Sequence, residues 1–386
     1  MNLIRIIISV TFLMNVGRFS VLAFFVVYLT KLIDLPIWQG GAILSILLIT
    51  HQTLPLCTGF ISDRVGHKYM LLIGFLITSI GYIGIALSSH FIYLCVMAFL
   101  AGVGAALYDP AIKSIIGLLS EKQRKHTFTL FNQALNSGAV IGALAGGLLI
   151  PVGDNIPLLF GALCYFILTI FISLYLRYLP SGNSSEKALS SIKKIYVHKS
   201  FLLFLSLMTL FWVLYTQLTV SLPLQFFDVI HNKQLVSMVI ITNGSIGFLL
   251  MYFIRNLFNS IQSKKMIQIG MLIMALSFFL IPLEPSLGWL ILCVIIFTIG
   301  ETFVLPGADI AIAEFSMYQD TGAFFGVFSL SYAIGGTIGN YLGTWLMEIP
   351  NLSSLPWLIY GMIGLIGFLL FGALNRIQEK KEFTET

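Results

Sequence analysis

Five ionisable residues lie inside long apolar stretches of this sequence, and they are the first candidates for chemistry. They are Arg18 in NVGRFSVLAF, Asp109 and Lys113 in YDPAIK, and Glu301 and Asp309 in GETFVLPGAD. A charge at the centre of a lipid bilayer costs about 3 kcal/mol or more, so such residues usually face a partner or a water-filled cavity. We therefore expect these five side chains to bind a substrate or a proton.

Asp109 and Lys113 are four residues apart. They share one face of a helix with the acid on the N-terminal side, which is the favoured order. One interpretation is a self-neutralising pair that lets both residues enter the membrane, and the other is a functional site. Arg18 does not readily lose its proton. We expect it either to pair with Asp109 or Glu301, or to bind an anionic group of a substrate.

Glu301 has no basic residue within one helical turn along the sequence. A carboxyl group at such a place suits a proton carrier, because it is neutral when closed off from water and ionised when water reaches it. The alternative is a permanently protonated carboxyl that hydrogen-bonds a neighbour. We take Glu301 as the main proton-carrier candidate, with Asp109 and Asp309 as further ones.

Uncharged polar residues add to this set. Tyr215, Gln217 and Asn243 can line a cavity for an amphipathic ligand. His51 can titrate near neutral pH, but we expect a packing histidine. The four cysteines lie in apolar runs without ligand spacing, so we predict no disulfide, no metal site and no cofactor. The sequence has no nucleophile–base set and no phosphate-binding loop, which argues against an enzyme.

The composition sets the class of the whole chain. Of its 386 residues, 58% are hydrophobic and 10% charged, whereas a soluble protein has about 25% charged residues. The chain is therefore an all-α polytopic membrane protein. Apolar runs of about 20 residues predict twelve spans, at residues 6–30, 38–61, 69–88, 92–118, 127–150, 157–178, 201–226, 236–258, 266–283, 287–314, 322–347 and 355–375.

The polar segment 181–200 predicts a linker between two six-helix bundles, at residues 1–180 and 201–386. If both termini are cytoplasmic, 17 of the 21 lysines and arginines lie on the cytoplasmic side or at its membrane boundary. Basic residues collect on that side of a membrane. We therefore expect a multi-pass protein of the cell (inner or plasma) membrane with both termini in the cytoplasm.

The two halves resemble each other at an offset near 196. Gly104 matches Gly300 and Pro110 matches Pro306, and a glycine ladder recurs with a shift of one residue. Matches in this order at one offset indicate a duplication. We therefore predict that the two bundles are pseudo-symmetric.

Twelve spans in two halves, with GFISDRVGHK between the second and third, resemble the major facilitator superfamily. Five residues fit the signature of that family's cytoplasmic loop, with His67 at a usually basic position: Gly59, Asp63, Arg64, Gly66 and Lys68. The resemblance implies that helices 1, 4, 7 and 10 line a central cavity, which three of these four helices supply with charges. It also implies that Asp63 acts in a gate near the start of helix 11, at Thr321 and Gly322.

The segment GAVIGALAGG on the fifth helix resembles a glycine motif of the drug:proton antiporters in this family. Its glycines are all present, with Ala143 in place of the proline: Gly138, Gly142, Gly146 and Gly147. Glycine at every fourth residue is also common wherever helices pack closely. The chain departs from the antiporter pattern at Ala98, where an arginine is usual, and at Leu118, where an aspartate is frequent.

The resemblance implies a secondary active transporter that exports an amphipathic, drug-like molecule by proton antiport with alternating access. The alternative is a transporter of an anionic metabolite or siderophore, for export or import, in which Arg18 and Lys113 bind the anion. Beyond the small molecule, protons and the lipid bilayer we expect no partner, no nucleic acid among them, and we expect a monomer. A receptor on the same scaffold needs an extra domain, and no such domain is evident in the sequence.

Overall fold

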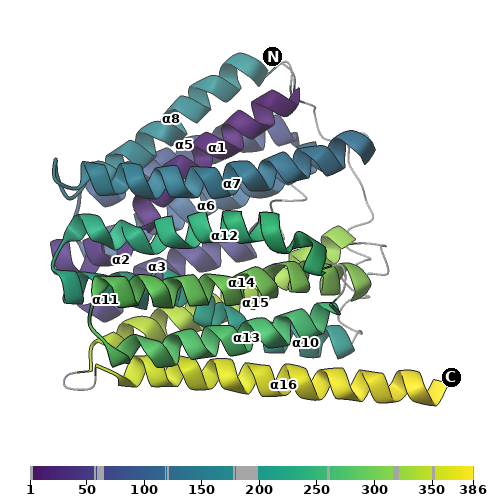
Figure 1. Ribbon diagram of the computed structural model, residues 1–386. Helices are drawn as coiled ribbons and strands as arrows, with labels where there is room; N and C mark the ends of the chain where they lie inside the picture. Colours follow the sequence, from purple (N-terminus) through teal and green to yellow (C-terminus); the bar gives the residue numbers. More distant parts are fainter. Residues whose placement is uncertain are drawn as a thin grey trace. The chain divides into compact units, whose positions relative to one another are not determined.

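The computed structural model places a set of residues that covers most of the chain, and its regular elements there are helices (Figure 1). The structure describes residues 3–55, 58, 65–117, 119, 121–176, 179, 199–258, 261–315, 321–349 and 353–385. The elements of the first part are α1 (Leu3–Leu22), α2 (Phe25–Val27), η1 (Tyr28–Leu32), α3 (Ile37–Thr53), α5 (His67–Ala86), α6 (Phe91–Gly117), α7 (Glu121–Leu149) and α8 (Ile156–Tyr175).

The second part of the chain follows the same plan. Its elements are α10 (Lys199–Tyr215), η3 (Thr216–Leu218), α11 (Ser221–Ile230), η4 (Lys233–Ser237), α12 (Met238–Phe258), α13 (Ser263–Leu280), η5 (Ile281–Leu283), α14 (Leu287–Phe315), α15 (Thr321–Met347) and α16 (Leu355–Glu385). The predicted single helix at 201–226 is thus interrupted by η3 before α11 begins. The last helix runs past its predicted end at residue 375.

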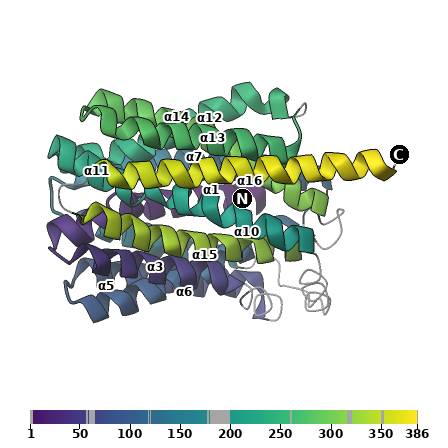
Figure 2. The same cartoon turned by 90° about the horizontal axis from the view of Figure 1, so that it is seen from below.

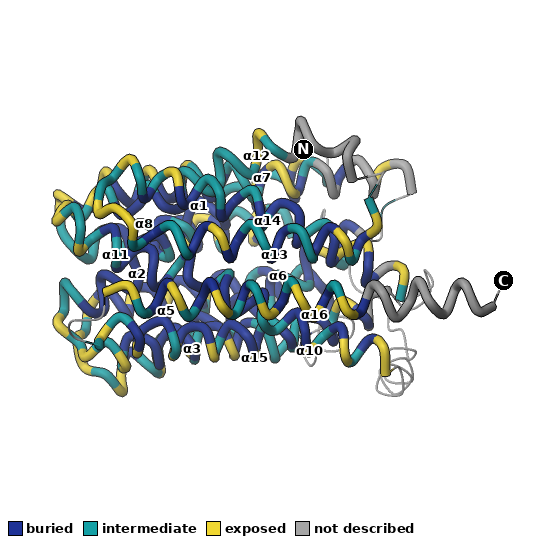
Figure 3. The backbone as a smooth tube through the Cα atoms, turned by 60° about the horizontal axis from the view of Figure 1, so that its bottom comes forward, coloured by how far each residue is buried: buried dark blue, intermediate teal, exposed yellow. Residues whose placement is uncertain are grey.

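Nine helical stretches among the described residues are long and apolar enough to cross a membrane. Helices α3, α7 and α15 complete the twelve that the sequence predicts. Large apolar side chains are exposed along α5 at a helical spacing, at Ile73, Leu76, Ile80 and Ile83. Figure 3 shows exposed residues that recur in the same way along α16 between buried and half-buried ones. Apolar surface of this kind suits contact with lipid.

By their contacts the residues form two compact units. Unit 1 contains 1–186 and 219–245, and unit 2 contains 187–218 and 246–386. The segment Thr219–Ser245, which includes α11 and η4, therefore belongs to unit 1 although its neighbours along the chain on both sides belong to unit 2. The predicted linker at 181–200 lies almost wholly outside the described residues and stays a prediction.

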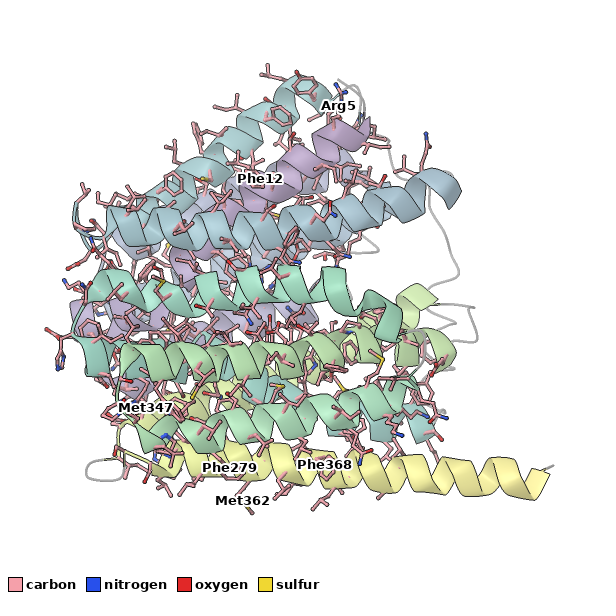
Figure 4. The ribbon with its side chains drawn as sticks, in the orientation of Figure 1. Arg5, Phe12, Phe279, Met347, Met362 and Phe368 are labelled. Atoms are coloured by element: carbon pink, nitrogen blue, oxygen red, sulfur yellow. The ribbon has the colours of Figure 1, made fainter. Side chains whose placement is uncertain are left out.

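Within unit 1, α5 packs against α6 and α8, and α1 packs against α7 and α8. Figure 2 shows α3, α5 and α6 side by side. Within unit 2, α13 packs against α14 and α16, and α10 packs against α15. In Figure 4, Phe279 of α13 points towards α16, where it contacts Gly361.

The same glycine contact occurs once in each unit. A Cβ atom built on Gly104 of α6 lies 2.5 Å from the carbonyl oxygen of Gly74 on α5. In unit 2, a Cβ built on Gly300 of α14 lies 2.7 Å from the carbonyl oxygen of Gly270 on α13. Side chains at these places would force the helix backbones apart. Both pairs are related by the offset of 196, so the duplication inferred from the sequence is visible in the packing of each unit.

Candidate functional site

Three helices of unit 1 bring together Arg18 from α1, His51 from α3 and Asp109 from α6. Nε2 of His51 lies 2.6 Å from Oδ2 of Asp109. The same carboxylate oxygen lies 3.9 Å from Nη1 of Arg18. Nη2 of Arg18 lies 3.4 Å from Nδ1 of His51, which closes the triangle. We call these three residues the charged cluster.

The hydrogen bonds of the charged cluster assign the proton on His51. A guanidinium group has only donors, so the ring nitrogen that faces it must accept. Nδ1 of His51 is therefore the acceptor towards Arg18, and Nε2 carries the hydrogen that it donates to Asp109. The side-chain nitrogen of Gln52 lies 3.5 Å from the same Nδ1 and also donates. The geometry thus corresponds to a neutral imidazole beside an ionised carboxylate.

Pro110 frees a carbonyl group of α6 for a hydrogen bond from the chain after α3. Proline has no N–H group, so it leaves the carbonyl of Ala106, four residues earlier, without its helical partner. The hydroxyl of Thr58 donates to that carbonyl at 2.6 Å, and Thr58 is buried. Helix α6 stays continuous through Pro110. The hydrogen bond from Thr58 therefore ties the chain after α3 to α6 close to Asp109.

A group of buried aromatic rings lies next to the charged cluster. Tyr108 adjoins Asp109 in the sequence, and its hydroxyl lies 3.0 Å from that of Tyr165 on α8. Phe75 of α5 packs on both rings, with centroids 4.9 Å from Tyr108 and 6.0 Å from Tyr165. Gly17, which adjoins Arg18, lets α1 approach Tyr165 closely. These contacts fix the backbone on which Arg18 and Asp109 sit.

Lys113 lies one helical turn beyond Asp109 and is exposed. Among the described residues, Asp109 is joined to Arg18 and His51, and no ion pair links it to Lys113. The self-neutralising Asp109–Lys113 pair that the spacing allowed is therefore not formed. The pairing of Arg18 with Asp109, which we expected as one alternative, is present.

His51 is the residue of this site that the sequence did not single out. We expected it to be a packing histidine, because nothing near it along the chain suggests a partner. Its partner lies 58 residues away on another helix. The signal that could have made it a stronger candidate for a functional residue is the occurrence of a histidine within a membrane span, where it is buried.

In unit 2, Glu301 and Asp309 both lie on α14, where Glu301 is half-buried and Asp309 exposed. Tyr215 belongs to an aromatic cluster on α10 and α15, in which Trp212 stacks on Tyr332 at 4.1 Å between centroids. Gln217 is fully buried and donates to the carbonyls of Val213 and Gly339. Its amide nitrogen therefore ties η3 to α15.

Of the other predicted site residues, the structure describes some and not others. Asn243 is half-buried in α12. Gly66 precedes α5 with a φ of 102°, a backbone conformation that a residue with a Cβ rarely adopts. Lys68 is half-buried and lies over the ring of Tyr69. Gly59, Asp63 and Arg64 lie outside the described residues.

The glycines of α7 face two different neighbours. Gly138 and Gly146 abut the backbone of α1 at Phe12 and Ser20, and Gly142 abuts it at Val16: a Cβ on Gly138 lies 2.7 Å from the carbonyl oxygen of Phe12. A Cβ on Gly147 instead meets Oγ of Ser237, in η4, at 2.8 Å. The first three glycines therefore act as a helix-packing surface. The motif interpretation for the four together stays a prediction.

Comparisons with known proteins agree with this architecture. The family model of the Major Facilitator Superfamily matches residues 7–263 and 231–385. Multidrug resistance protein MdtH of Salmonella arizonae is 27% identical over 372 residues, which cover 94% of this chain and 92% of that protein. The same protein of Salmonella typhimurium is 26% identical with equal coverage.

Solved structures show the same fold at low sequence identity. A POT family transporter in complex with a thioalcohol conjugated peptide has a TM-score of 0.83 at 16% identity, covering 98% of this chain and 96% of its own. The nucleoside transporter NupG has a TM-score of 0.81 at 16% identity, covering 97% and 99%. The match of the family model over nearly the whole chain defines a membrane transporter and not an enzyme. The chain belongs to the Major Facilitator Superfamily.

Proposed function

We propose that the protein exports an amphipathic small molecule across the cell membrane in exchange for protons. The observation that carries this proposal is the charged cluster of Arg18, His51 and Asp109 inside the membrane-spanning helices of unit 1. Ionisable groups within a membrane are expensive and mark substrate or proton pathways. The full-length similarity to multidrug resistance protein MdtH supports the export of drug-like compounds.

Carboxyl groups supply the proton-binding part of the proposal. Glu301 is the main carrier that we propose, with Asp109 and Asp309 as further ones. Asp109 has a titratable partner in His51, so a proton that arrives at this pair is shared between an imidazole and a carboxylate. Protonation of these groups would then bias the switch between inward-open and outward-open states.

Aromatic side chains supply the ligand-binding part. Trp212, Tyr215 and Tyr332 offer flat apolar faces with polar atoms at their edges. Such groups suit an amphipathic ligand that presents a ring system. Trp212 is held in place by a 3.0 Å hydrogen bond to Ser331.

Transport into inverted membrane vesicles tests the proposal. Ethidium accumulation is measured after a pH gradient is imposed with the vesicle interior acid, and nigericin is then added to collapse the gradient. We expect ethidium to accumulate and nigericin to abolish the accumulation. Vesicles from cells that do not express the protein should show no accumulation. If neither ethidium nor any dye of a neutral and anionic panel accumulates under this gradient, proton-coupled export is contradicted.

A second candidate function rests on the charge balance of the same region. The positive charges of Arg18 and Lys113 outnumber the single negative charge of Asp109. The region therefore carries surplus positive charge in both protonation states of His51. An anionic metabolite could bind there. Thermal unfolding in the presence of citrate or of ethidium separates the two candidates, since the true ligand raises the unfolding temperature.

The orientation is part of the proposal. The concentration of basic residues on one side supports an orientation in which both termini, and the start of α5 at Lys68, face the cytoplasm. A thiol reagent that cannot cross membranes should then label Lys233→Cys in intact cells and Lys68→Cys only in inverted vesicles. The opposite pattern would reverse the orientation.

A further inference from the structure

The two ring nitrogens of His51 have opposite tasks in the charged cluster. Nε2 donates to Asp109 across 2.6 Å, while Nδ1 accepts from Arg18 across 3.4 Å and faces the amide of Gln52 at 3.5 Å. The residue is buried, so water does not readily replace either partner. Arg18 therefore depends on the lone pair of Nδ1 for this contact.

We propose that a proton bound at Nδ1 of His51 displaces the guanidinium group of Arg18 from the charged cluster. His51 is then a positioning residue whose protonation state decides where Arg18 lies. This inference rests on the proposed proton-coupled function and names the group that senses the proton.

The step is a simple proton transfer with a clear consequence. The lone pair of Nδ1 becomes an N–H bond, the Nε2–H bond remains, and the imidazole becomes an imidazolium cation. Two donors and two positive charges then face each other where an acceptor faced a donor before. The hydrogen bond to Asp109, which is already 2.6 Å long, becomes an ion pair between an imidazolium and a carboxylate. The carboxylate therefore retains His51 while Arg18 is repelled.

The charged groups around His51 agree with Asp109 retaining the protonated ring while Arg18 is repelled. Asp109 favours the imidazolium, whereas Arg18 on α1 and Lys113 on α6 add positive charge beside it. Helices α2 and η1 also pack against α3, and of these η1 contributes Tyr28 and Lys31. Lys31 is engaged in an ion pair with Asp228. Asp109 is thus the group that retains a proton on His51, and Arg18 is the group that yields.

The consequence for transport is that a proton on Nδ1 of His51 and Arg18 in its observed position exclude each other. Arg18 is in contact with His51 and Asp109 when His51 is neutral, and it leaves this position when His51 is protonated. Because Arg18 lies on α1, whose backbone is closely packed against three glycines of α7, the displacement acts on the side chain and not on the helix.

The first test reads the tautomer directly and needs no substrate. The purified wild-type protein in detergent is labelled with ¹⁵N-histidine, and the ring nitrogens are followed by NMR from pH 9 to pH 5. The chain has six histidines. The signal of His51 is assigned by its absence from His51→Gln or, if that variant does not fold, by replacing the other five histidines.

We expect the neutral Nε2–H tautomer at high pH and an imidazolium at low pH. The pH at which His51 titrates should change in Arg18→Gln and stay unchanged in the matched control Arg5→Gln. Arg5 is exposed at the start of the same helix (Figure 4). An Nδ1–H tautomer, or a His51 signal that is indifferent to Arg18, would overturn the inference.

The second test uses transport. Glutamine at position 51 keeps an N–H donor for Asp109 but cannot bind the proton. We expect His51→Gln to accumulate at least tenfold less ethidium than wild type under the pH gradient, with a pH profile that differs from that of wild type. His90→Gln, at an exposed histidine, is the matched control and should behave as wild type.

The outcomes separate the two proposals. If wild type shows no accumulation under the pH gradient, the proposed function fails, and the tautomer measurement still decides the switch. If wild type accumulates ethidium and His51→Gln does so equally with an unchanged pH profile, the function stands and the His51 switch is wrong.

Discussion

Nζ of Lys31 lies 2.8 Å from Oδ1 of Asp228, so an ion pair joins η1 to α11 across 197 positions of the chain. A second ion pair joins Lys233 to Asp154 at 2.9 Å, between η4 and the segment after α7. Both pairs hold the segment 219–245 in unit 1. Each is partly exposed and contributes only about 0–1 kcal/mol. Contacts this weak suit a segment that detaches and returns.

We therefore predict that a covalent link at the first ion pair stops transport. In Lys31→Cys/Asp228→Cys, made in a background where the four native cysteines are replaced, oxidation should abolish vesicle transport and dithiothreitol should restore it. Each single cysteine variant is the control for oxidation damage. Full transport by the oxidised, cross-linked protein would show that η1 and α11 stay together throughout the cycle.

The effects of substitutions at Thr58 and Pro110 on the free energy of unfolding should not be additive. Thr58→Val leaves the carbonyl of Ala106 buried without its donor, which costs about 1–3 kcal/mol. Pro110→Ala restores a backbone N–H for the same carbonyl. In thermal or denaturant unfolding we expect Thr58→Val to destabilise the protein, and Pro110→Ala to remove most of that cost in the double variant. Additive effects of the two changes would contradict this account.

Gly142 and Gly147 should differ in their tolerance of a side chain. A methyl group at Gly142 meets the backbone of Val16, which cannot move away without shifting α1, so we expect Gly142→Ala to cost about 1–3 kcal/mol. At Gly147 the nearest atom is the Ser237 hydroxyl, which can rotate, so Gly147→Ala should cost less. Unfolding temperatures of the two variants check this order, and the reverse order would refute it.

Glu301→Gln should weaken the dependence of transport on the pH gradient, because glutamine cannot exchange a proton. We expect exchange without a gradient to persist and gradient-driven accumulation to fall at least tenfold. Glu284→Gln, at an exposed position after α13, is the matched control. If Glu301→Gln transports with an unchanged pH dependence, the role proposed for Glu301 is wrong.

The fold could be read from the sequence because its causes are local. Apolar runs of membrane length fix the helices, and the offset of 196 between Gly104 and Gly300 showed the duplication before any contact was known. The structure repeats this pair in the same α5–α6 and α13–α14 contacts. The break between α10 and α11 was missed, since the apolar run continues through η3 without interruption.

The candidate site could be read only in part. Asp109 and Arg18 were visible as charges within apolar runs, and their pairing was one of the alternatives. Lys113 had the better spacing to Asp109 along the helix but is exposed, whereas Arg18 of α1 and His51 of α3 contact the carboxylate. Gln217 looked like a cavity residue, and instead its amide donates to two carbonyls inside unit 2.

The sequence by itself determined that this is a twelve-span membrane protein of the Major Facilitator Superfamily with charges in its first, fourth and tenth helices. Hydropathy carries the spans and repeat spacing the duplication, and the resemblance of GFISDRVGHK to the loop signature of the family indicates the family. Only the tertiary structure decided that His51 binds Asp109 and that its other nitrogen faces Arg18. The physical reason is that these three residues lie on separate helices, and the rotation of each helix about its axis is set by side-chain packing between helices. No local pattern records that rotation.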